Sequence, residues 1–399
     1  MRSWQYLSRY GQTVGLKKPL ENFPLLRGIL RCIEWTQQLR IVFADPCDPA
    51  DWAVRYNTVA EFILIFRKSH FPRLTELICD CHTGSSALRA LPCWLSPELL
   101  KLELRVDGTD AFTSLILRTL HEYTPRLTSL SVCFGDDESI SHASHDLSST
   151  LNALTQLQVF KAQSSLVLEP GVWKELASLP NLRSVDILSD FECLGHRTPK
   201  KFFRYWHADP APPTVDVDDP FPTLESIDGD ISADLVPKIF GMRGICKLRH
   251  LKLVIQDAPS ELTIQTIFQT IPAYYNQLET FSVKLKAWEA PRHDLTTFVF
   301  ERLKTFSLWT TKPFVIAPDA FLEFTQRHPG LLSLTLTRSD QDTKAGFPPD
   351  IVPRILEACP SLGWLHINLQ GSCFSMHLSH EDIQKLRAEQ GLQLDVKQA

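Results

Sequence analysis

Three short groups of cysteine, histidine and carboxylate residues have the side-chain types that bind metals. They are Cys79-Asp80-Cys81, His142 and His145 with Asp146, and His377 and His380 with Asp382. A zinc site needs about four ligands, which usually come as two spaced pairs. Since no second pair accompanies any group, the sequence predicts a strand for the first, a polar loop for the second and a helix cap for the third. We expect no metal and no cofactor.

Motifs for catalysis are absent from the sequence. It contains no Gly-rich phosphate loop, no His-Glu-x-x-His helix and no Gly-x-Ser-x-Gly nucleophile elbow. We therefore expect a non-catalytic protein. An enzyme with an unrecognised site in loops is the minor alternative.

Composition restricts the classes of partner. The 399 residues are 44% hydrophobic and 22% charged, which is typical of a folded protein. Acidic residues outnumber basic ones, 46 to 41, so no basic excess offsets a phosphate backbone, and nucleic acid is not expected as a partner.

No apolar stretch reaches the roughly 18 residues of a membrane span, and the first residues lead to no signal-peptide core. We expect no membrane partner and a cytoplasmic or nuclear location.

One pattern, Leu-x-x-Leu-x-Leu, recurs along the chain. The eleven leading leucines are Leu74, Leu99, Leu127, Leu157, Leu182, Leu224, Leu248, Leu278, Leu303, Leu331 and Leu362, and a weaker copy starts at Leu39. Subtraction of successive positions from Leu74 onward gives spacings of 24 to 31 residues, apart from 42 between Leu182 and Leu224. Proline precedes seven of these leucines by two positions. A chance series of buried strands would not keep both features, so the pattern indicates leucine-rich repeats.

Each repeat predicts a short strand, a turn and a returning helix. The apolar residues of the pattern point inward, and the residues between them point outward. Helical spacing is clear over residues 110–123, 262–274, 319–327 and 350–358, with Asp110, Asp319 and Asp350 as expected N-caps. The predicted fold is therefore an α/β, irregular leucine-rich-repeat solenoid with a parallel concave sheet and convex helices.

The domain boundaries follow from this repeat. We expect a helical N-terminal cap or a remnant segment over residues 1–50, the solenoid over 51–375, and a C-terminal capping helix and tail over 376–399. The long spacing contains a Pro/Asp-rich segment at about 207–220, which predicts a protruding loop. A solenoid completes its core without a second subunit, so we expect a monomer.

The repeat register also assigns the outward side chains of the concave sheet. Early repeats place charged residues there, among them Glu76, Lys101, Glu103 and Arg105. Exposed aromatic residues on a strand surface are enriched at binding hot spots, although a tryptophan can also pack against a terminal loop, and charges can form a merely solvated face. The candidate partner-binding face is Lys252, Lys284, Lys286, Trp309, Trp364, His366 and Asn368.

Residues 35–375 resemble the irregular repeats of fungal F-box/leucine-rich-repeat proteins. The resemblance rests on Phe71-Pro72-Arg73-Leu74, Thr124-Pro125-Arg126-Leu127, Leu179-Pro180-Asn181-Leu182 and Cys359-Pro360-Ser361-Leu362. It implies recruitment of a protein substrate to an SCF-type ubiquitin ligase, in which an N-terminal F-box docks on Skp1 and thereby on the cullin.

The sequence itself has no recognisable F-box. Its nearest approach, Phe23-Pro24-Leu25-Leu26, lacks the acidic residue of the F-box opening and is better explained as part of a return helix. Skp1 and cullin are therefore expected partners only if an F-box lies upstream. The alternative is an F-box-free scaffold or inhibitor built on the same repeats.

Overall fold

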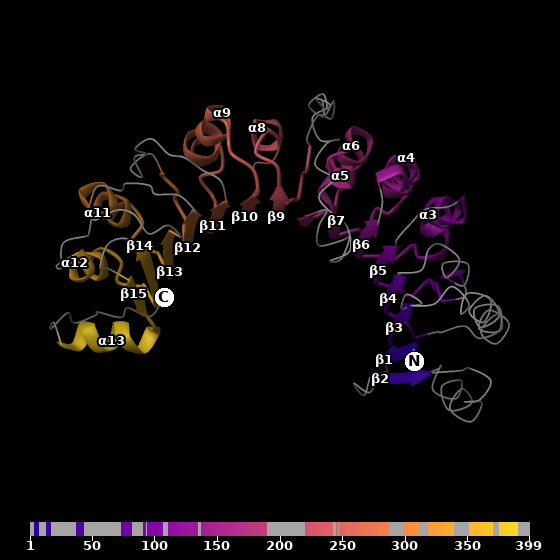
Figure 1. Cartoon of the computed structure of the whole chain (residues 1–399), viewed down its shortest axis with the longest axis horizontal. Helices are drawn as coiled ribbons and strands as arrows, with labels where there is room; N and C mark the ends of the chain where they lie inside the picture. Colours follow the sequence, from indigo (N-terminus) through magenta and orange to yellow (C-terminus); the bar gives the residue numbers. More distant parts are fainter. Residues whose placement is uncertain are drawn as a thin grey trace. The chain divides into compact units, whose positions relative to one another are not determined.

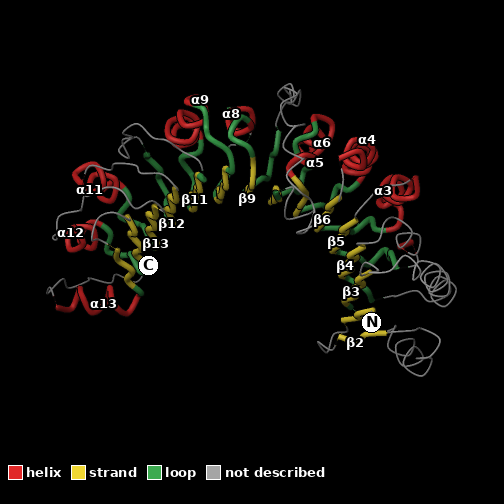
Figure 2. Tube along the Cα trace, in the orientation of Figure 1, coloured by secondary structure: helices red, strands yellow, loops and turns green. Residues whose placement is uncertain are grey.

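A computed structural model of the chain contains two compact units, Met1–Thr223 and Leu224–Ala399 (Figure 1). Within each unit the strands form a sheet and the helices lie along one side of it (Figure 2). The structure describes residues 4–7, 13–16, 37–43, 73–81, 91–92, 94–106, 111–134, 137–189, 220–241, 245, 247–286, 298–310, 318–338, 351–369 and 375–389.

Unit 1 contains six consecutive parallel strands. They are β3 (Gln38–Phe43), β4 (Glu76–Cys81), β5 (Lys101–Val106), β6 (Ser129–Phe134), β7 (Val159–Gln163) and β8 (Ser184–Leu188). The helical segments beside them are α3 (Ala111–Tyr123), α4 (Asp137–Ala153), α5 (Ser164–Val167) and α6 (Pro170–Ser178). The weak repeat at Leu39 does form a strand, but Leu39 pairs with Leu77 of β4 and not with the leading Leu74, so the predicted register of this repeat is wrong by three residues.

The N-terminal end of unit 1 differs from its prediction. Strand β1 (Trp4–Leu7) pairs antiparallel with both β2 (Thr13–Leu16) and β3. The described part of residues 1–50 is therefore β-structure, and the predicted helical cap is not formed by these residues. An antiparallel hairpin satisfies the open edge of β3, which a parallel array alone leaves unpaired.

Unit 2 also has six parallel strands. They are β9 (Ser226–Ile231), β10 (His250–Ile255), β11 (Thr280–Leu285), β12 (Thr305–Thr310), β13 (Ser333–Arg338) and β14 (Trp364–Leu369), and β15 (Ser375–Leu378) then pairs antiparallel with β14. The helical segments are α8 (Leu235–Phe240), α9 (Glu261–Gln265), η5 (Thr266–Thr270), α10 (Ile271–Tyr274), α11 (Pro318–Arg327), α12 (Ile351–Ala358) and α13 (His380–Glu389).

Equivalent positions of successive repeats stack in both units. Leu251 pairs with Phe281, Phe281 with Phe306 and Phe306 with Leu334, and all four are fully buried. All eleven leading leucines are at most 3% exposed. This stacking of apolar residues between strands and helices confirms the predicted α/β leucine-rich-repeat solenoid.

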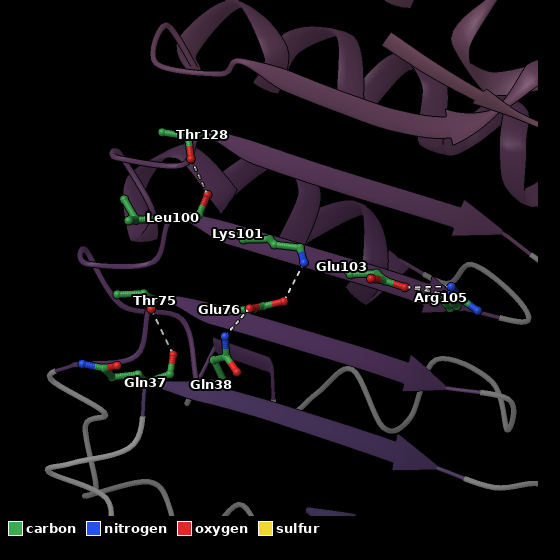
Figure 3. Close-up of polar contacts among 9 residues, drawn as sticks. All are labelled: Gln37, Gln38, Thr75, Glu76, Leu100, Lys101, Glu103, Arg105 and Thr128. Carbon is green, nitrogen blue, oxygen red and sulfur yellow. Dashed lines mark hydrogen bonds and ion pairs between the residues drawn. The ribbon is translucent and has the colours of Figure 1, made fainter. Parts of the chain in front are cut away.

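A second ladder precedes the strands. Just before β4, the backbone N–H groups of Thr75 and Glu76 both donate to the carbonyl of Gln37, at 2.9 and 3.0 Å. The same arrangement joins later repeats, where Lys304 and Thr305 donate to Glu279. Threonine side chains reinforce it at two positions, because Thr75 Oγ1 donates to Gln37 and Thr128 Oγ1 to Leu100 (Figure 3). Each repeat therefore fixes the start of the next strand.

The predicted return helices are present, but their starts differ from expectation. Asp319 lies in the first turn of α11 instead of capping it, and Asp110 and Asp350 lie outside the described residues. Ser260 caps α9 by accepting a hydrogen bond from the N–H of Thr263. The π-helical turn η5 comes just before Pro272, which has no N–H to donate to the carbonyl of Phe268.

Phe221, just before the repeat that begins at Leu224, has an unusual backbone conformation. Its φ of 57° lies in the left-handed region, which costs a non-glycine residue free energy. Its N–H donates to the carbonyl of Ala177, and its ring packs 4.8 Å from the buried ring of Trp173. These contacts hold the strained backbone. The loop predicted at about 207–220 lies outside the described residues except for Pro220.

Candidate functional site

The outward side chains of β10 to β14, together with Lys286 and His377, form a surface that we name the strand face of unit 2. Parallel pairing places them in rows across the strands, so that His250, Thr280 and Thr305 share one row and Lys252, Ser282 and Ser307 the next. The sequence-predicted site residues belong to this surface by register. For Asn368 in β14, the structure describes the backbone but not the side chain.

Small hydroxyl side chains fill the middle of this face. Three consecutive strands, β11 to β13, carry them at seven of nine outward positions: Thr280, Ser282, Thr305, Ser307, Ser333, Thr335 and Thr337. All seven are half-buried. The centre is therefore polar, uncharged and low in side-chain bulk, and it presents both donors and acceptors.

The three predicted lysines do not present free charges. Lys252 pairs with Asp228 at 2.7 Å, and Lys286 donates to the side chain of Gln256, which in turn donates to Asp230. Lys284 lies over the ring of Trp309, with its ammonium 4.3 Å from the ring centroid. Such a contact orders both groups and leaves the ring half-buried.

One carboxylate with two basic neighbours borders the face where β11 and β12 begin. Glu279 accepts a hydrogen bond from Lys304 at 2.7 Å and lies 3.8 Å from Arg249. The Lys304 hydrogen bond holds the pKa of Glu279 below its ordinary value, and the charges of Lys304 and Arg249 act in the same direction. Two basic side chains thus share one carboxylate at this edge.

Trp364, His366 and His377 form an aromatic cluster at the β14 end of the face. Trp364 is 41% exposed, and its ring meets that of His377 edge to face at 4.5 Å. His366 is the pairing partner of His377, and their Nδ1 atoms are 3.3 Å apart. Burial, followed by the charge of His377, lowers the pKa of His366, which keeps its imidazole neutral near pH 7.

Sequence reasoning missed His377 as a member of this face. It was grouped with His380 and Asp382 because the three are close in sequence. The only signal for its true position is the alternation in Ser375-Met376-His377-Leu378, and four residues are too few to reveal strand pairing.

The other chemistry-bearing groups have structural roles. Cys79 is a fully buried residue of β4, as the strand prediction requires, whereas His142, His145 and Asp146 lie in α4 and not in the polar loop predicted for them. The predicted cap before α13 is confirmed, since Asp382 accepts from the N–H of Ser379 at 3.0 Å and from its hydroxyl at 2.8 Å. These hydrogen bonds lower the pKa of Asp382.

The described residues contain neither a metal-binding group of three or more ligands nor a membrane-spanning helix. No group of three or more His, Cys, Asp or Glu residues within the described ranges is arranged to hold a metal ion. Over the same part of the chain, no helix has the length and apolar character required to cross a bilayer.

Comparison with known proteins finds similarity among solved structures. No protein-family model matches it, and no curated protein does. Among solved structures it is similar to a crystal structure of a TLR13–ssRNA13 complex, with 16% identity and a TM-score of 0.37 over 76% of this chain. The match covers 47% of that protein, so this chain spans about half the length of the structure that it matches.

Proposed function

We propose that this chain is a non-catalytic protein-binding module and that the strand face of unit 2 binds its partner. The observation that carries the proposal is the position of Trp309 and Trp364 on one sheet, two strands and two rows apart. Strand spacing of about 4.8 Å and a rise of about 3.3 Å per residue put their backbones roughly 16 Å apart. A ligand that contacts both tryptophans must therefore be at least as long as an extended peptide or a patch on a folded protein.

The charge pattern favours a protein over a nucleic acid as the partner. The Lys252 ammonium is paired with a carboxylate, Lys284 lies over an aromatic ring, and the chain has a net charge of -5. Phosphate binding requires basic side chains in excess, whereas neutral hydroxyls beside aromatic rings are typical of protein interfaces. The binding act is noncovalent, and the preorganised strands reduce its ordering cost.

The more specific form of the proposal is substrate recognition for an SCF-type ubiquitin ligase in the cytoplasm or nucleus. It is supported by the repeat motifs that resemble F-box/leucine-rich-repeat proteins. Skp1 and cullin would join through an F-box upstream of the repeats. An F-box-free scaffold or inhibitor would use the same face without the adaptor, and the chain would be a monomer outside its complex.

The test is affinity capture with wild type and the Trp309→Ala/Trp364→Ala variant. If both rings are hot spots, each truncation costs at least about 2 kcal/mol, or roughly 30-fold in affinity, and a specific partner is lost. Tyr274→Ala is the matched control, because Tyr274 is 57% exposed but lies in α10 on the helix side.

The outcomes distinguish whether the strand face binds the partner from whether the chain serves a ubiquitin ligase. A partner lost from the double variant but kept by Tyr274→Ala supports the strand face as its binding site. Direct binding of purified Skp1 supports the ligase form, and its absence favours the scaffold. A partner retained equally by all three proteins overturns the assignment of the face.

A further inference from the structure

We propose that His366 and His377 form a two-histidine binding site for a divalent transition-metal ion, with Zn²⁺ as the expected ligand. The site goes beyond partner binding and does not depend on it. The first observation is register: His366 in β14 and His377 in β15 are direct partners of an antiparallel pair. Directly opposite residues of such a pair project from the same face of the sheet, so both imidazoles lie on the strand face.

The distance between the two rings fits shared coordination. Their Nδ1 atoms are 3.3 Å apart. A zinc ion bound about 2.05 Å from each of two nitrogens at a tetrahedral angle requires them to be about 3.3 Å apart. Without an ion, the same separation allows an N–H of one ring to donate to the nitrogen of the other. A bound ion would replace that hydrogen bond without moving either ring.

The surroundings orient the pair. Trp364 meets the His377 ring edge to face at 4.5 Å, which restricts rotation of that imidazole. His366 is half-buried and His377 exposed, so an ion can reach the site from solvent. Neutral imidazole suits Zn²⁺, Cu²⁺ and Ni²⁺ and is a poor ligand for Mg²⁺ or Ca²⁺.

The proposed site keeps open coordination positions. No third His, Cys, Asp or Glu completes a group with this pair among the described residues. Water would occupy the remaining positions in the free protein. Affinity is then expected well below that of a closed four-ligand structural site.

The test titrates the metal-free protein of 399 residues with Zn²⁺ alone, by calorimetry. Wild type should show a saturable site, and His366→Gln or His377→Gln should each weaken it by more than roughly tenfold, since losing even a residue that merely supports a ligand costs about that much. His250→Gln is the control, because His250 is exposed on the same face but belongs to β10. Circular dichroism checks that each variant is folded.

A second readout uses Cu²⁺ and does not require removal of either histidine. The emission of Trp364 is obtained as the difference between wild type and Trp364→Phe, and bound Cu²⁺ should quench it. The proposal is overturned if wild type has no saturable site up to about 1 mM Zn²⁺. It is equally overturned if a folded His366→Gln/His377→Gln protein binds Zn²⁺ as wild type does, or if Cu²⁺ binds without quenching Trp364.

Discussion

The buried imidazole of His328 makes two hydrogen bonds that determine which ring nitrogen carries the proton. Its Nε2 accepts from the N–H of Phe300 at 3.1 Å, so the proton must be on Nδ1, which donates to the carbonyl of Phe324 at 2.7 Å. The residue is 3% exposed. Burial is the main cause that lowers its pKa; the Arg327 charge adds to it, and the Phe324 hydrogen bond opposes it.

This environment predicts a pH-dependent stability. The unfolded imidazole has a pKa of about 6.5 and the folded one a lower value, so below about pH 6.5 the unfolded state binds more protons. The free energy of unfolding should fall as pH drops through that window and should be unaffected by this group above it. Urea titrations near about pH 7.5 and about pH 5.5 measure the loss, which should be smaller in His328→Gln than in wild type. An equal loss in both proteins would contradict the prediction.

At the scale of elements, a buried arginine joins α13 to the last repeat. Arg387 is 4% exposed and donates to the carbonyl of Cys359 at 2.9 Å. The Cys359 thiol itself donates to the carbonyls of Thr325 and His328. Burial raises the pKa of this thiol to about 12, so it remains protonated and packs as an unreactive group.

Loss of the arginine head group should release this helix. Arg387→Met keeps the apolar stem but leaves the Cys359 carbonyl without its charged donor, which should cost about 1–3 kcal/mol. Hydrogen exchange should accelerate in residues 380–389 while β10 to β12 stay protected. Lys385→Met in the same helix is the control, since the Lys385 side chain is 76% exposed, and it should leave exchange unchanged.

The repeat strands and most helices could be predicted from the sequence because their signals are local. Leu248-x-x-Leu251-x-Leu253 contains its own strand start and inward positions, and the 3.6-residue period of α11 is complete within one helix. Strand β15 and the β1–β2 hairpin could not be predicted, because their partners are set by pairing between segments and each strand has only four residues. For the same reason the sequence could place Trp364 and His366 on one face but not His377.

At the scale of the whole molecule, stability should be distributed among repeats. In a repeat array each unit contacts only its neighbours, so damage in one place need not unfold distant repeats. Phe306 is a suitable probe because it is fully buried and its ring lies 4.7 Å from Phe324 and 5.6 Å from Phe298.

Phe306→Ala should cost about 3–5 kcal/mol and separate unfolding into two steps. Hydrogen exchange during a urea titration should show β11 to β13 losing protection first, with β5 to β7 retaining it to higher urea. Val299→Ala is the control, as Val299 is 52% exposed and its truncation should change stability by less than about 0.5 kcal/mol. Simultaneous loss of protection in both sets of strands would exclude independent repeats.

The shared carbonyl before each strand has a consequence for how the repeat tolerates changes in length. Since two N–H groups at the start of each strand from β4 to β8 and from β10 to β14 bind one carbonyl of the preceding repeat, pairing restarts at a fixed point whatever the number of residues in between. Leading leucines 24 to 31 residues apart within one unit thus give the same strand register. Insertions on the helix side should be absorbed there, so the spacing of the side chains offered to a partner is insulated from the length of the loops that connect them.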